Sequence, residues 1–272
     1  MKKKLLVGLA VGLIMLSAIP NLWAGDIEGI RAKAETGDVA AQFQLAEQYA
    51  KGIDTKKDSA EALKWMRKAA DQGHAEAQAQ VGLCFHNGIG VEKDYTAAVE
   101  WYLKSVKQGC ANAQNSLGVC YRDGLGVNKD YSKAAEYFGK AAEQGHAEAQ
   151  MNLGICYAKG EGVGQDSAKS FQYYKKAAEQ GLGQAQHNLG VCYYKGRGTE
   201  KNLSEAVVWF RKAAEQGIAD AQFNLAGCYN NGEGVPRNKE EAMRQMRKAA
   251  DLGHVQAKQI MRQYEEWKAS QK

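Results

Sequence analysis

The chain of 272 residues repeats one pattern every 36 residues. The cysteines that mark this period are Cys84, Cys120, Cys156, Cys192 and Cys228. Two series of glycines, one beginning at Gly37 and the other at Gly52, keep the same spacing, and no insertion interrupts them between residues 38 and 253. A unit this short cannot bury an apolar face alone, so six units must stack on one another.

Each unit has the pattern of two helices. In the first unit, Ala41, Leu45 and Tyr49 are four residues apart and therefore share one face of a helix. Gly52 ends that helix, because glycine adopts the left-handed conformation at a helix C-terminus without a steric penalty. Asp58 then provides an acceptor for the first amides of a second helix. The sequence thus predicts an all-α solenoid of 36-residue helix-turn-helix repeats with about fourteen helices.

Small residues also recur inside the first helix. Glycine is found at Gly82, Gly118, Gly154 and Gly190, where it destabilises a helix by about 1 kcal/mol relative to alanine. We expect a neighbouring helix to approach closely at these positions.

The first 24 residues have the pattern of a secretory signal peptide. Three lysines precede an apolar run over residues 5–19, Pro20 follows, and cleavage is expected near Ala24. The run is shorter than the roughly 20 residues that span a bilayer, although an uncleaved anchor reaching Gly25 is the alternative. We therefore expect a periplasmic or secreted protein. Cleavage lowers the formal charge from +5 to +2, which is too balanced for a nucleic-acid-binding protein.

The ends of the array differ from the repeats. Residues 25–37 correspond to the end of a second helix and are expected to form an N-terminal capping helix. The six repeats occupy residues 38–253, and residues 254–272 form a more polar C-terminal capping helix.

The repeat resembles a known family. Ala149-Gln150-x-x-Leu153-Gly154-x-x-Tyr157-x-x-Gly160-x-Gly162-Val163, followed by Lys175-Lys176-Ala177-Ala178-Glu179-Gln180-Gly181, is similar to the Sel-1-like repeat, a relative of the tetratricopeptide repeat. The resemblance implies a right-handed superhelix whose first helices line the concave surface, and a scaffold or adaptor role. It also implies a link to secreted bacterial relatives that act in the envelope or on hosts, some of which have been described as binding or weakly hydrolysing β-lactams.

One face of the first helices is a candidate binding groove. An amide recurs there, and amides present both donors and acceptors to the backbone of an extended peptide; the alternative is that the slot is polar only because solvent is near. Neighbouring slots vary most between units, as specificity-determining positions would. The residues of the hypothesis are Asn152, Asn188, Asn224, His187, Tyr194 and Arg122. An apolar stripe beside them, which includes Val191, either packs between helices or lines the groove.

The cysteine spacing argues against disulfides. Equivalent positions in stacked helices are about 10 Å apart, whereas a disulfide needs Cα atoms within about 7 Å. We therefore expect no disulfide and buried free thiols, with Cys110, at a helix start, as the one candidate reactive thiol.

No catalytic motif is present. Ser-x-x-Lys, His-Glu-x-x-His and Cys-x-x-Cys are all missing from the sequence. We predict a monomeric, non-enzymatic scaffold that binds a protein or extended peptide, with no metal, cofactor, nucleic acid or membrane insertion after cleavage. The alternatives are a β-lactam- or cell-wall-related activity and a secreted effector that engages host proteins.

The export prediction has a direct check. Expressed with its own N-terminus in a Gram-negative host, the protein should accumulate outside the cytoplasm with an intact mass that lacks residues 1–24. A full-length mass in the membrane fraction would instead identify an uncleaved anchor.

Overall fold

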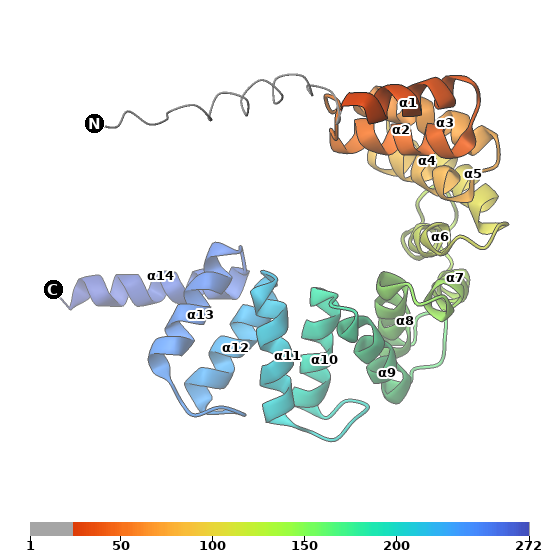
Figure 1. Cartoon of the computed structure of the whole chain (residues 1–272). Coiled ribbons are helices and arrows are strands. Elements are labelled where there is room, and N and C mark those ends of the chain that lie inside the picture. Colours follow the sequence, from red (N-terminus) through yellow and green to blue (C-terminus); the bar gives the residue numbers. More distant parts are fainter. Residues whose placement is uncertain (1–23, 272) are drawn as a thin grey trace, which may run out of the picture. The chain divides into compact units, whose positions relative to one another are not determined.

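The computed structural model describes residues 24–271, and this part of the chain consists of fourteen helices joined by turns and loops, with no strand (Figure 1). The predicted signal segment lies outside the described residues, apart from Ala24, the first residue of α1. The all-α repeat fold predicted from the 36-residue period is confirmed. The helices divide into two compact units, one ending at Gln108 and the other beginning at Gly109.

In the first compact unit, which ends at Gln108, each helix packs against the next in the chain. Its helices are α1 (Ala24–Glu35), α2 (Val39–Lys51), α3 (Ser59–Asp71), α4 (Ala75–Asn87) and α5 (Tyr95–Val106).

In the second compact unit, which begins at Gly109, each helix likewise packs against the next. Its helices are α6 (Ala111–Asp123), α7 (Tyr131–Glu143), α8 (Ala147–Lys159), α9 (Ser167–Glu179), α10 (Gly183–Lys195), α11 (Leu203–Glu215), α12 (Ala219–Asn231), α13 (Lys239–Asp251) and α14 (Val255–Ser270).

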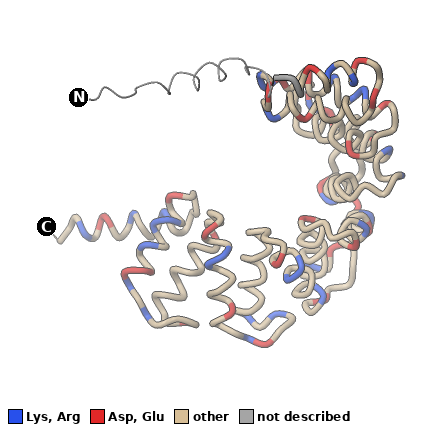
Figure 2. Tube along the Cα trace, in the orientation of Figure 1, with Lys and Arg blue, Asp and Glu red and all other residues tan. Residues whose placement is uncertain are grey.

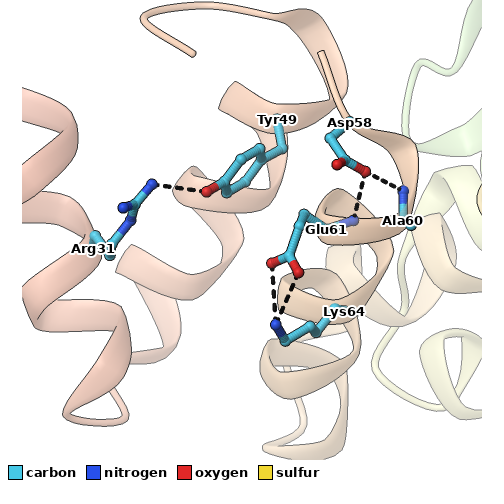
Figure 3. Close-up of polar contacts among 6 residues, drawn as sticks. All are labelled: Arg31, Tyr49, Asp58, Ala60, Glu61 and Lys64. Carbon is cyan, nitrogen blue, oxygen red and sulfur yellow. Dashed lines mark hydrogen bonds and ion pairs between the residues drawn. The ribbon is translucent and has the colours of Figure 1, made fainter. Parts of the chain in front are cut away.

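The helix ends follow the predicted capping pattern. Asp58 Oδ1 accepts hydrogen bonds from the amides of Ala60 at 2.9 Å and Glu61 at 3.0 Å, which starts α3 (Figure 3). Gly52, with φ of 72°, ends α2 in the left-handed conformation. Side-chain caps also start the other second helices, from Asp94, Asp130, Asp166, Asn202 and Asn238. The period of the sequence is therefore built from repeated start and stop signals.

An aromatic ring on the second helix lies against glycine on the first. A Cβ atom at Gly118 would come within 2.6 Å of the ring of Phe138, which is fully buried. The same contact pairs Gly82 with Tyr102, Gly154 with Tyr174, and Gly190 with Phe210. In the first and last repeats these two slots hold Ala46 with Met66 and Ala226 with Met246. The predicted close approach is confirmed, and its cause is the ring.

Glutamines form hydrogen bonds both within a repeat and to the repeat before it. Gln186 donates to the carbonyl of Ala178 at 3.2 Å and accepts at 2.9 Å from Gln216, which also donates to the carbonyl of Gly181 at 2.9 Å. The same donor–acceptor relation joins Gln72 to Gln42, Gln108 to Gln78, Gln144 to Gln114, and Gln180 to Gln150. In each pair the acceptor glutamine is buried and the donor is exposed, so the donor satisfies an amide oxygen that would be costly to bury alone.

The ring-on-glycine contact can be tested by one methyl group. Gly118→Ala should lower the free energy of unfolding by about 1 kcal/mol, since overpacking costs about 1–3 kcal/mol and helix propensity returns about 1 kcal/mol. Adding Phe138→Met, which copies the Ala226–Met246 pair, should recover most of the loss. Urea denaturation measures both variants; a Gly118→Ala protein as stable as the parent would show that the ring can move away freely.

Candidate functional site

All six predicted groove residues lie on first helices of the second unit. Arg122 is on α6, Asn152 on α8 and Asn224 on α12. The remaining three, His187, Asn188 and Tyr194, are on α10. The structure gathers Arg122 with Asn152 and the other four around α10 and α12, in two groups with different surroundings.

The first group uses its polar atoms internally. Asn152 is only 8% exposed, donates to Asn115 Oδ1 at 3.0 Å, and accepts from Arg122 at 3.4 Å. The Arg122 guanidinium donates to both carboxylate oxygens of Asp123 at 2.8 Å, and this pairing raises its pKa. Asn152 is thus a buried structural amide rather than an open groove residue.

The second group lines two adjoining cavities. The larger, of about 500 Å³, lies between the C-terminal end of α8, α9 and α10, and His187, Asn188 and Val191 form part of its wall. Tyr174 forms another part, and burial raises its pKa to about 12. Asn188 is the equivalent of Asn152 one repeat later, but the slot of its hydrogen-bond partner Asn115 is occupied by Met151. A thioether is a weak hydrogen-bond partner, and Asn188, which lines the cavity, instead accepts a bond of 3.4 Å from Gln184 on its own helix.

The smaller cavity, of about 280 Å³, lies between α10 and α12. Tyr194, Asn224 and Val191 line its walls, and Phe210 and Met246 reach it from the second helices α11 and α13. Because Val191 lines both cavities, they adjoin across this one side chain.

Glycine keeps the smaller cavity open. Gly227 lines it and occupies the slot that holds Leu83, Val119, Ile155 and Val191 in the four preceding repeats. A Cβ atom built at Gly227 meets nothing within 4 Å. The cavity therefore exists because the sixth repeat lacks the aliphatic side chain of its predecessors.

Two hydrogen bonds set the polarity of the walls. Asn224 Nδ2 lies 3.0 Å from His187 Nε2, and burial lowers the pKa of this histidine. Tyr194 donates to Glu233 at 2.8 Å, and this bond raises the pKa of Tyr194 to about 12. At neutral pH both rings are uncharged, whereas Arg197 in the larger cavity and Lys195 in the smaller one add positive charge to the walls.

The four buried cysteines are not activated as nucleophiles. Cys192 lines the larger cavity, and burial raises its pKa to about 11. Burial also raises the pKa of Cys120, Cys156 and Cys228 to about 11. A thiol with such a pKa is protonated at pH 7, and the thiolate is the reactive form. Within residues 24–271 none of the six cysteines forms a disulfide, and Cys110, the N-cap residue of α6, is partly exposed.

The described residues offer neither a metal cluster nor a membrane span. Residues 24–271 contain no group of three His, Cys, Asp or Glu side chains that could hold a metal, and none of their helices is long and apolar enough to cross a membrane. Lys and Arg are interspersed with Asp and Glu along the helices (Figure 2).

The sequence did not identify the second-helix residues of the site. Phe210 and Met246 belong to the core pattern, and nothing in their spacing shows that one edge of each side chain reaches a cavity. Gly227 did carry a signal, because it is the one glycine in a slot otherwise filled by larger side chains from the first repeat to the fifth.

Stacked helical hairpins with a 36-residue period define an α-helical solenoid of the tetratricopeptide type. Six segments match the Sel1 repeat, over residues 39–74, 75–110, 111–146, 147–182, 183–218 and 219–254. The chain belongs to the Sel1 repeat family.

Two solved structures are similar over most of this chain. A protective antigen of uropathogenic Escherichia coli with an SLR fold is 38% identical, with a TM-score of 0.77, and the match covers 85% of this chain and 50% of the antigen. A Sel1 repeat protein from Oxalobacter formigenes is 32% identical, with a TM-score of 0.76, over 84% of this chain and 91% of that one.

A curated relative is similar over a shorter segment. The secretory immunoglobulin A-binding protein EsiB of Escherichia coli is 38% identical over 68 residues, which are 25% of this chain and 14% of EsiB. This chain therefore spans a small part of EsiB and half of the antigen.

The buried histidine predicts a pH effect. Because Asn224 donates, His187 Nε2 must accept, and a protonated ring could no longer accept this hydrogen bond. Burial disfavours the protonated ring as well. The folded-state pKa is depressed, so the stability contributed by neutral His187 is present above the unfolded value of about 6.5 and is lost as pH falls below it.

The test is an NMR titration of the His187 ring together with thermal unfolding between pH 8 and 5. The midpoint should lie below the ordinary histidine value. His187→Gln, which keeps an amide in place, should lose less stability on acidification than the parent. Equal losses in the two proteins would exclude His187 as the cause.

Proposed function

We propose that this protein is a non-enzymatic scaffold that binds an extended segment of a partner protein on the face formed by α10 and α12. The observation that carries the proposal is the pair of adjoining cavities, which contain four of the six residues that the sequence pattern selected. Sel1 repeat proteins commonly serve as protein-interaction scaffolds, and the finer assignment to this face rests on the geometry.

The chemistry of the face suits a peptide. The smaller cavity has an apolar floor from Phe210 and Met246, which suits an aliphatic or aromatic side chain of the guest. Asn188 and Asn224 stand at the walls of the two cavities, where amides can pair with peptide N–H and C=O groups. A segment with side chains in both cavities would pass over Val191.

We also propose that the protein acts after export, which the N-terminal lysines and apolar run support. A partner on a host is the second candidate, favoured by the similarity to EsiB, whose name records binding of secretory immunoglobulin A. Hydrolysis of a β-lactam has less support, because the cavity thiol of Cys192 is protonated at neutral pH and the sequence contains no Ser-x-x-Lys motif.

Filling the smaller cavity tests the proposal. Peptides selected from a random linear library on the immobilised protein should bind the parent and lose binding to Gly227→Leu. Leucine restores the aliphatic side chain of the earlier repeats, and the position has free space, so the variant should remain folded. Gly227→Ala is the matched control: it adds one methyl group, leaves most of the cavity open, and should retain binding. Calorimetric titration gives the affinities.

A second variant addresses the polar walls. Asn188→Ala combined with Tyr194→Ala should weaken the same peptides while leaving the helical circular-dichroism spectrum unchanged. Selected peptides that bind Gly227→Leu and this double variant as tightly as the parent would place the binding face elsewhere.

A further inference from the structure

The second helix of the sixth repeat departs from a rule that the other five obey. One slot on that helix is aromatic in every earlier repeat, as Trp65, Trp101, Tyr137, Tyr173 and Trp209, whereas α13 has Gln245 there. In each earlier repeat the lysine three residues later places its Nζ over the ring, between 3.8 and 5.4 Å from the centroid. Lys248 keeps the lysine of this pair without the ring.

A cavity of about 260 Å³ opens where the ring would lie. It is bounded by α11, α12 and α13, and its lining includes Tyr229, Gln245 and Lys248. Gln245 turns its amide back to Glu241 on its own helix. The structure shows no ring contact and no ion pair for Lys248 within residues 24–271.

Two other repeats show how a ring fits this place. Tyr137 stacks on Tyr121 with centroids 5.7 Å apart and planes 6° from parallel, and Tyr173 stacks on Tyr157 at 5.8 Å and 4°. Tyr229 occupies the slot of Tyr121 and Tyr157 in the sixth repeat. Arg211 donates to the Tyr229 hydroxyl at 2.7 Å and so fixes the orientation of this ring.

An independent observation marks the same cavity. Gln222 lines it and is 5% exposed, and its buried Oε1 accepts no hydrogen bond. In the earlier repeats the corresponding oxygen accepts from a glutamine, but the donor position here is Leu252. The cavity wall therefore contains an acceptor that lacks its donor.

We propose that this cavity receives a tryptophan or tyrosine side chain of a partner polypeptide, with its ring between Tyr229 and Lys248. An aromatic ring is the guest because the chain itself supplies one at five equivalent places. Lysine over a ring is attractive and is strongest for tryptophan. An indole N–H or phenol O–H also gives the guest a donor for Gln222 Oε1.

The site is separate from the proposed peptide-binding face. Gln222, Leu225 and Tyr229 line this cavity, whereas Phe223, Asn224 and Gly227 line the smaller cavity of that face. At 100° per residue these two sets point to opposite sides of α12. The inference therefore goes beyond the proposed function and does not depend on it.

The probe is a pair of capped tripeptides, acetyl-Gly-Trp-Gly-amide and acetyl-Gly-Leu-Gly-amide, titrated into the ¹⁵N-labelled protein and followed by NMR. The tryptophan peptide should produce saturable shifts at the amides around Tyr229 and Lys248, and the leucine peptide should produce much smaller ones. Equal shifts with both peptides, or shifts confined to other helices, would overturn the proposal.

Three variants complete the test. Gln245→Trp restores the internal ring and should abolish the saturable shifts, whereas Gln245→Ala keeps the cavity open and should retain them. Lys248→Met keeps the stem, removes the cation, and should weaken binding even if Gln245→Trp folds poorly. Unchanged binding in both Gln245→Trp and Lys248→Met would overturn the proposal.

Two further results separate the alternatives. Gly227→Leu should bind the tryptophan peptide as the parent does, so loss of the peptide-binding face would not affect this result. Trp267 is 58% exposed on α14, so a second copy of the chain could supply the ring. Self-association that shifts the amides around the cavity, and that Trp267→Ala abolishes, would make a second copy the occupant and overturn the partner proposal.

Discussion

Within each central repeat, a buried aromatic ring rests directly on a glycine of the facing helix, and this contact sets how closely the two helices approach. A side chain as small as alanine would collide with the ring, so the two slots change together: glycine with an aromatic residue, alanine with methionine. The candidate site depends on the same contact. Phe210 rests on Gly190 and also forms part of the floor of the smaller cavity, so one ring serves both the core and the site.

The sequence could predict the repeat fold because its signals are local and recur six times. Asp58 and Gly52 each act on the few residues beside them, and repetition turns such weak signals into a strict 36-residue pattern. The close approach of a neighbouring helix at Gly118 could be predicted for the same reason, because glycine recurs in that slot. The aromatic partner was not, because its distance in sequence does not show which helix face it shares.

The candidate site was only partly predictable, because equal slots have unequal neighbours. Asn152 and Asn224 occupy one slot, yet Asn115 and Arg122 enclose the first, while the second stands beside His187 at an open cavity. The cavities themselves arise from what is missing, a side chain at Gly227 and a ring at Gln245. A repeat consensus is derived from the residues that the repeats share, so it gives no weight to single departures from it. Here those departures are the positions at which the cavities form.

The glutamine contacts within and between repeats also constrain how a protein of this kind can change over evolutionary time. Gln216, Gln186 and the carbonyl of Gly181 meet from three points of the chain that are 30 and 35 residues apart. One residue inserted inside α10 would rotate everything after it by about 100° and separate these groups. Adding or removing a complete repeat leaves every such junction intact. Within its helices the array can therefore lengthen or shorten only in whole repeats, and a new binding surface can arise by duplicating a repeat and then shortening a single side chain.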